Sequence, residues 1–181
     1  HRDLHSFPTR RSSDLNDKIK IIETAIEAEK ETLGTYIKSA IKVSNIVGKN
    51  MFLKLALDEM KHREILEAAL KAQLEGGKCV FPEVEKNEIK KIVPDVESEI
   101  EKTSHLGQDD LAILMLAQKV EKNGIDYYKD CIKNSWDEET KKMFSYLVRM
   151  EEEHYSLIQT QIDYIEGTGY WLGIREFTLD D

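Results

Sequence analysis

A pair of Glu-x-x-His motifs, separated by 92 residues, constrains this chain more than any other feature. A second motif, Glu-Lys-x5-Tyr, lies upstream of each copy and repeats with the same spacing and without a gap. The repeated positions are Glu29 and Glu121, Tyr36 and Tyr128, Glu59 and Glu151, and His62 and His154. The sequence therefore predicts two copies of one helix pair, each supplying two carboxylates and one imidazole.

Four stretches carry apolar residues at the 3.6-residue spacing of amphipathic helices. The first two are expected at about residues 16–47 and 51–74, with a break at Gly48-Lys49-Asn50. The third is expected to begin near Asp109 and the fourth near Asp137. Short links make each successive pair an antiparallel hairpin, so we predict an all-α four-helix bundle.

The link between the two hairpins differs in kind from the links within them. Residues 78–108 are long enough for a crossover along the bundle, and we expect one or two short helices in this stretch. The C-terminal residues 170–177 are aromatic, and we expect this short segment to pack on the end of the bundle.

The first fifteen residues do not resemble the rest of the chain. They contain three arginines and no helical apolar period, and they can be back-translated in one open frame to a common sequencing-library adapter. We interpret residues 1–15 as an artefact, expect them to be disordered, and assign residues 16–181 to a single domain.

Composition excludes several classes of function. Without the first fifteen residues the net charge is −10, which argues against binding to nucleic acid or to an anionic membrane surface. No apolar run approaches the ~20 residues that a membrane span requires. Cys79 and Cys131 are far apart and form no C-x-x-C motif, so a reduced, cytoplasmic compartment is the simplest expectation.

Helical phase separates candidate ligands from surface charges. Glu29 lies on the apolar stripe of the first helix, and Glu121 lies on that of the third. In each Glu-x-x-His motif the two residues share one helix face. Four carboxylates directed at one core repel each other, and an isolated buried carboxylate is very costly. Two divalent cations relieve both problems, and carboxylate oxygens with one imidazole per metal suit iron or manganese.

Other interpretations remain open at this stage. A single Glu-x-x-His on a charged helix is usually solvated surface, and a metal-free helical interaction module is the alternative for the whole chain. Tyr36 and Tyr128 lie two turns beyond Glu29 and Glu121 on the same faces. They could hydrogen-bond the carboxylates or serve only in core packing.

These motifs resemble those of the rubrerythrin family, within the ferritin-like superfamily. The resemblance covers the chain from about Asn16 onwards and implies a ferritin-like fold with a non-haem di-iron centre. It implies that Glu59 and Glu151 bridge the irons and that Glu29 and Glu121 are terminal ligands. His62 and His154 would each bind one iron. The implied activities are reduction of hydrogen peroxide or O2, in oxidative-stress defence, and oxidation of ferrous iron.

Two departures from the family pattern affect the expected function. The sequence holds no four-cysteine rubredoxin domain, so electrons would come from an external donor such as a rubredoxin-like protein. Gly124 stands where rubrerythrins carry an additional glutamate, which favours a more symmetric centre. A ferroxidase with little peroxidase activity is therefore the alternative within this family. We also expect a homodimer or larger homo-oligomer.

Overall fold

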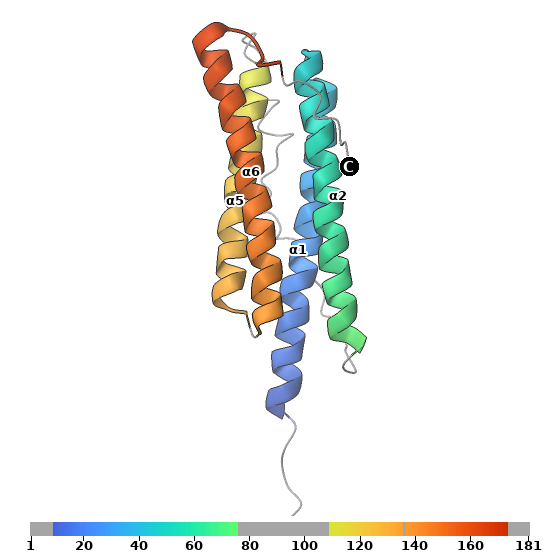
Figure 1. The fold of residues 1–181 in the computed structure, drawn as a ribbon. Coiled ribbons are helices and arrows are strands. Elements are labelled where there is room, and N and C mark those ends of the chain that lie inside the picture. Colours follow the sequence, from blue (N-terminus) through green and yellow to red (C-terminus); the bar gives the residue numbers. More distant parts are fainter. Residues whose placement is uncertain (1–8, 76–108, 136, 174–181) are drawn as a thin grey trace, which may run out of the picture.

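The computed structural model describes residues 9–75, 109–135 and 137–173, and the regular structure in these ranges is helical (Figure 1). The helices are α1 (Thr9–Lys42), α2 (Ile46–Glu75), α5 (Asp109–Lys133) and α6 (Glu138–Thr168). Helix α1 packs along α2, and α5 packs along α6. The two hairpins lie side by side, which confirms the predicted all-α four-helix bundle.

Helices α2 and α5 run in the same direction (Figure 1). The crossover predicted for residues 78–108 lies outside the described residues. Within each hairpin, by contrast, the two helices are antiparallel and joined by a short turn, as predicted.

The first helix begins earlier than the sequence indicated. We expected residues 1–15 to be disordered, but α1 begins at Thr9 and continues through Asn16 without interruption. The expectation is therefore wrong for residues 9–15, and residues 1–8 lie outside the described part. A helix already stabilised by packing extends at little cost, since each added residue contributes a backbone hydrogen bond.

The turn between α1 and α2 is also displaced from its predicted position at Gly48-Lys49-Asn50. The chain turns at residues 43–45, where the Asn45 side chain accepts a hydrogen bond from the Val47 backbone N–H at 2.8 Å. Gly48 lies inside α2, where a Cβ atom would come within 2.6 Å of both Trp171 and Val43. The glycine thus permits close packing and does not end a helix.

The C-terminal segment packs on this end of the bundle, as predicted. Trp171 covers Gly48, and its indole N–H donates to Asp110 at 3.0 Å. Gln161 is fully buried, and its side chain exchanges two hydrogen bonds of 3.1 Å with the backbone of Leu172. Tyr170 remains exposed, and residues 174–177 lie outside the described part.

The turn of the second hairpin and the end of α6 follow the sequence closely. The Asp137 carboxylate caps α6 by accepting from the Thr140 backbone N–H at 2.7 Å. Helix α6 ends at Gly169, whose φ of 76° is the left-handed conformation that glycine adopts without steric cost.

The apolar core is divided into two clusters, and each contains residues from all four helices. The cluster at the Trp171 end includes Tyr36, Phe52, Leu114 and Ile158. The cluster at the opposite end includes Ile22, Leu66, Tyr128 and Phe144. Ionisable side chains lie between the two clusters.

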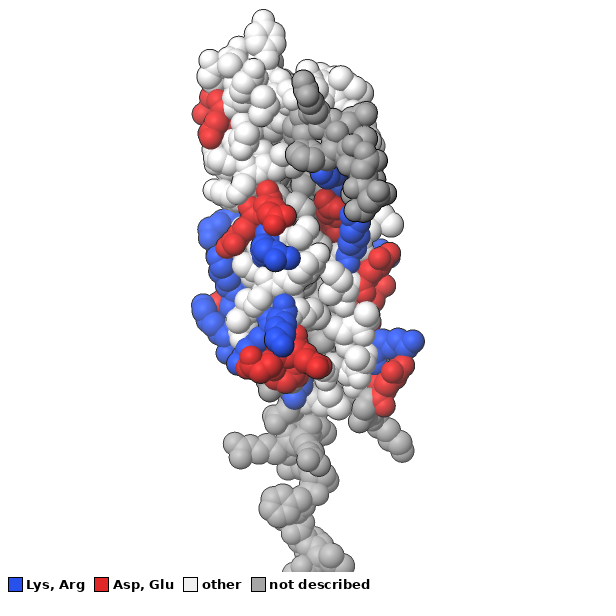
Figure 2. All heavy atoms as spheres, viewed as in Figure 1, with Lys and Arg blue, Asp and Glu red and all other residues white. Residues whose placement is uncertain are grey.

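The surface carries both signs of charge. On the face shown in Figure 2, acidic and basic side chains are interspersed. Several exposed ion pairs join residues of one helix, such as Lys122 with Asp126 at 2.7 Å. Exposed pairs of this kind contribute little to stability. Among the described helices, none combines the length and apolarity that crossing a membrane requires.

The close packing at Gly48 leads to a stability prediction. Replacing a helical glycine with alanine normally stabilises by about 0.5–1 kcal/mol. At Gly48 the new methyl group would overlap Trp171 and Val43, and overpacking costs about 1–3 kcal/mol. We expect Gly48→Ala to lower the free energy of urea unfolding. Gly34→Ala, which meets open space, should raise it. Stabilisation by both variants would contradict the packing role of Gly48.

Candidate metal centre

Six ionisable residues meet in the middle of the bundle, between the two apolar clusters. Helices α1 and α5 each contribute one carboxylate, while α2 and α6 each contribute one carboxylate and one imidazole. None of the six is more than 4% exposed. They are the predicted ligands Glu29, Glu59, His62, Glu121, Glu151 and His154.

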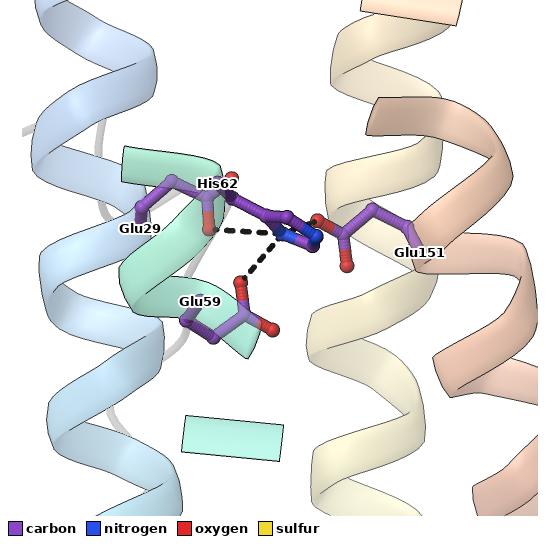
Figure 3. A group of neighbouring side chains, drawn as sticks. All are labelled: Glu29, Glu59, His62 and Glu151. Carbon is purple, nitrogen blue, oxygen red and sulfur yellow. Dashed lines mark hydrogen bonds and ion pairs between the residues drawn. The ribbon is translucent and has the colours of Figure 1, made fainter. Parts of the chain in front are cut away.

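Helical geometry explains how four helices bring six ionisable side chains together. Residues three apart lie on one face of a helix, so Glu59 and His62 project together from α2. Glu151 and His154 do the same from α6. The single carboxylates, Glu29 on α1 and Glu121 on α5, complete the set, and Figure 3 shows Glu29 beside His62.

The six residues form two overlapping groups. Ligand atoms of Glu29, Glu59, His62 and Glu151 all lie within 4.8 Å of one another. Ligand atoms of Glu59, Glu121, Glu151 and His154 satisfy the same criterion. Glu59 and Glu151 belong to both groups, so each could contact two ions. Glu29 and Glu121 belong to one group each.

Each imidazole directs its Nδ1 atom toward the carboxylates. The Nδ1 atom of His62 lies 3.1 Å from both Glu59 and Glu151 and 3.8 Å from Glu29 (Figure 3). The Nδ1 atom of His154 lies 3.3 Å from Glu59, 3.5 Å from Glu151 and 3.7 Å from Glu121. The two rings are stacked with centroids 5.4 Å apart. Both Nδ1 atoms are therefore placed to act as metal ligands.

The two tyrosines singled out in the sequence contact Glu121 and Glu29 across the bundle. The Tyr36 hydroxyl donates to Glu121, and the Tyr128 hydroxyl donates to Glu29. Both rings are almost fully buried and pack on phenylalanines, with centroids 5.9 Å apart for Tyr36 and Phe52. These residues thus combine both of the roles considered from the sequence, core packing and hydrogen bonding.

Burial and mutual repulsion separate the acidities of the four carboxyl groups. Desolvation raises the pKa of Glu29 and Glu121 well above the usual value. The charge of Glu151 adds to the effect on both, and that of Glu59 adds to the effect on Glu29. Desolvation acts in the same direction on Glu59 and Glu151. For these two, hydrogen bonds from the histidines and from the protonated neighbours outweigh it and lower the pKa.

The pKa values of the two histidines are raised, whereas burial lowers the pKa of an ordinary buried imidazole. Burial alone would lower the pKa of His62, but hydrogen bonds to Glu151, Glu29 and Glu59 raise it to about 12. Burial likewise opposes the charge on His154, and the surrounding carboxylates raise its pKa. In the absence of metal, protons held by the imidazoles and by two carboxyl groups therefore compensate the negative charge.

The residues fit a pair of divalent cations. Buried atoms without a hydrogen-bond partner in the described part of the chain include Glu59 Oε1, Glu121 Oε2 and His154 Nδ1. Such atoms are costly unless a ligand satisfies them. Each group offers carboxylate oxygens and one imidazole nitrogen, which is the donor set used by iron and manganese. No thiolate contributes, because Cys131, the free cysteine among the described residues, is buried in the Tyr128 cluster.

A small pocket reaches the carboxylates between α1 and α5. Its volume of about 10 Å³ is space for one water-sized molecule. Its lining includes Glu29, Glu59, Glu121 and Glu151, together with Ala28, Thr32, Val120, Gly124, Tyr127 and Tyr128. Most of these residues are related by the repeat, so that Thr32 corresponds to Gly124. The pocket therefore lies where the two halves meet.

One residue close to the centre was not identified from the sequence. The carboxylate of Asp58 lies 3.6 Å from Nε2 of His154 and accepts a hydrogen bond from Lys61 at 2.8 Å. Contacts with His154 and Lys61 hold the pKa of Asp58 well below its usual value, although burial opposes this. A sequence signal was available, because the repeat pairs Asp58 with Met150 and so breaks the symmetry.

Comparisons with known proteins bear on this centre. The family model for rubrerythrin matches residues 20–161, which include all six clustered residues. A solved structure of a hypothetical protein from Pyrococcus furiosus is similar, with a TM-score of 0.62 and 23% sequence identity over 90% of this chain and 98% of that one. At this identity the likeness supports the fold alone. No curated protein matches the chain. The family match covers most of the sequence and all four helices, and the chain therefore belongs to the rubrerythrin family.

Proposed function

We propose that this protein is a non-haem di-iron oxidoreductase that reduces hydrogen peroxide or O2 with electrons from an external donor, in defence against oxidative stress. The observation that carries the proposal is the pair of overlapping ligand groups, which share Glu59 and Glu151 in a buried centre. Membership of the rubrerythrin family supports the choice of iron over other divalent ions.

The geometry suggests a role for each ligand. Glu59 and Glu151 would bridge the two ions, because each belongs to both groups. Glu29 and Glu121 would each bind one ion and be held in place by a tyrosine hydroxyl from the opposite hairpin. Such supporting hydrogen bonds fix the orientation of a ligand carboxylate and tune its basicity.

The chain supplies positions, protons and exclusion of water. Reduction of hydrogen peroxide consumes two electrons and two protons and yields two water molecules, and bound iron would supply electron transfer to the oxidant. Glu29 and Glu121, whose pKa values are raised by burial, can hold protons beside the centre. The apolar clusters on either side keep bulk water from the carboxylates.

The pocket between α1 and α5 supports a small oxidant as the substrate. Its volume, which is space for about one water-sized molecule, is closer to the size of O2 or peroxide than to that of an organic substrate. A Cβ atom at Gly124 would lie 3.9 Å from Glu151, so the missing side chain leaves space next to a ligand carboxylate. Small molecules could reach the centre by this route.

Gly124 also favours a second candidate function. The family resemblance places a glutamate here in rubrerythrins, and its absence makes the centre more symmetric. A ferroxidase that oxidises ferrous iron with O2 is the candidate that this observation supports. Rapid Fe(II)-dependent O2 uptake without donor-dependent peroxide turnover would identify it. The rubredoxin-like donor, the homo-oligomer and the cytoplasmic location remain predictions, as does manganese in place of iron.

The central test is metal stoichiometry with peroxide turnover. We expect the anaerobic protein to bind two Fe(II) per chain and, with a reduced rubredoxin, to consume peroxide. Glu151→Ala should abolish both binding events, because this carboxylate is shared, whereas Glu29→Ala should abolish one. Glu152→Ala, at the exposed neighbour that pairs with Lys129, is the matched control and should bind two. Iron binding without peroxide turnover with any electron donor would refute the proposed peroxidase activity.

Metal binding should release protons and strengthen as pH rises. Both histidines, Glu29 and Glu121 have raised pKa values, which favours their proton-bound forms, and a cation must displace these protons. Lowering the pH therefore favours the proton-bound form and weakens binding. Calorimetric titration with Fe(II) in buffers of different ionisation enthalpy measures the protons released. Binding that is independent of pH between 5.5 and 8, chosen to span the usual histidine pKa of about 6.5, would contradict this prediction.

Filling the pocket should slow the reaction without removing the metal. Gly124→Leu places a branched side chain in the pocket, and we expect kcat/KM for peroxide to fall roughly tenfold or more, equivalent to about 1.4 kcal/mol. Iron content should stay at two per chain. Gly34→Leu, at a helical glycine with no atom within 4 Å of the new Cβ, is the control. Equal kcat/KM in both variants would exclude this route.

A further inference from the structure

The two halves of the centre differ in the residues that flank the Glu-x-x-His motifs. Asp58 precedes Glu59 in the first copy, whereas Met150 precedes Glu151 in the second. The repeat also pairs Lys61 with Glu153. The six clustered residues are identical in type between the copies, so any difference between the two metal positions must come from such neighbours.

Asp58 connects the protein surface to one histidine. Its carboxylate accepts from Lys61 through Oδ1, and its Oδ2 atom lies 3.6 Å from Nε2 of His154. This separation is an ion-pair contact longer than a hydrogen bond, so Nε2 of His154, like that of His62, has no hydrogen-bond partner among the described residues. The contact crosses between the hairpins, because Asp58 is on α2 and His154 is on α6. The His154 ring therefore directs Nδ1 toward the clustered carboxylates and Nε2 toward the carboxylate of Asp58.

His62 has no equivalent support. Its ion pairs in the described part of the chain all involve Nδ1, the atom that faces the centre in Figure 3. Its Nε2 atom is buried and has no hydrogen-bond partner among the described residues. The repeat pairs Asp58 with Met150, and a thioether is a weak and uncharged acceptor.

We propose that Asp58 is a positioning residue for His154, and that it makes the two metal positions inequivalent. The position built on His154 binds a divalent cation more tightly than the position built on His62. A carboxylate at the outer nitrogen of a ligating imidazole fixes its tautomer, holds the ring in orientation and raises its basicity. The inference rests on the proposed metal binding and states which of the two metal positions has the higher affinity.

Variants that retain one histidine separate the two positions. The probe is Co²⁺, titrated into the metal-free full-length chain and followed by visible absorption. His62→Gln leaves the His154 position, and His154→Gln leaves the His62 position. In the His62→Gln chain we expect Asp58→Ala to weaken Co²⁺ binding by roughly 10-fold to 100-fold. In the His154→Gln chain the same substitution should change it by less than about threefold, because the coupling requires His154.

A transplant tests the converse. Met150→Asp together with Glu153→Lys copies the Asp58–Lys61 pair into the second motif. In the His154→Gln chain this double variant should strengthen Co²⁺ binding to the His62 position by roughly tenfold. Asp126→Ala is the control for loss of a carboxylate, since Asp126 is exposed on α5 and pairs with Lys122. Thermal unfolding without metal shows whether any variant is misfolded.

The outcomes distinguish this inference from the proposed function. If the wild-type chain binds no Co²⁺ and no Fe(II), the metal centre itself is refuted, and the inference with it. If it binds two ions, but Asp58→Ala weakens both positions equally or neither, only the inference is wrong. Selective weakening at the His154 position in a chain with unchanged thermal unfolding supports it, because a purely structural role would not depend on which histidine remains.

Discussion

The burial of four carboxyl groups and two imidazoles in the middle of a helical bundle is the constraint on which the rest of this structure depends. Each buried charge loses its hydration, and the loss is large unless a partner compensates it. Here the groups compensate one another in part, since each His Nδ1 atom lies against three carboxylates and the tyrosine hydroxyls donate to Glu121 and Glu29. The apolar clusters on either side of these six residues supply the stability that the buried ionisable groups do not.

The six residues are divided equally between the two hairpins, so neither hairpin alone holds a complete centre. Tyr36 of the first hairpin supports Glu121 of the second, and Tyr128 of the second supports Glu29 of the first. The shared carboxylates follow the same pattern, because Glu59 and Glu151 each contact histidines of both hairpins. Assembly of the centre is therefore coupled to docking of the hairpins.

Departures from the repeat show where the two halves acquire different tasks. Gly124 replaces the threonine found at the equivalent position of the first half and leaves space beside Glu151. Asp58 replaces the methionine found in the second half and lies against His154. Both differences are adjacent to ligands, whereas the ligands themselves are strictly repeated. A symmetric ligand set can therefore differ in access and in the support of its histidines.

The sequence by itself determined the fold class, the pairing of helices into hairpins and the six residues that cluster. Period and repeat are local properties of the chain, so a 3.6-residue pattern and a constant offset can be recognised without coordinates. Tertiary structure decided what depends on contacts between distant segments. Gly48 lies within α2 because Trp171 needs the space, although glycine in isolation indicates a break. The crossed tyrosine contacts, the pocket beside Gly124 and the approach of Asp58 to His154 exist only because the hairpins dock, and no spacing along the chain encodes that geometry.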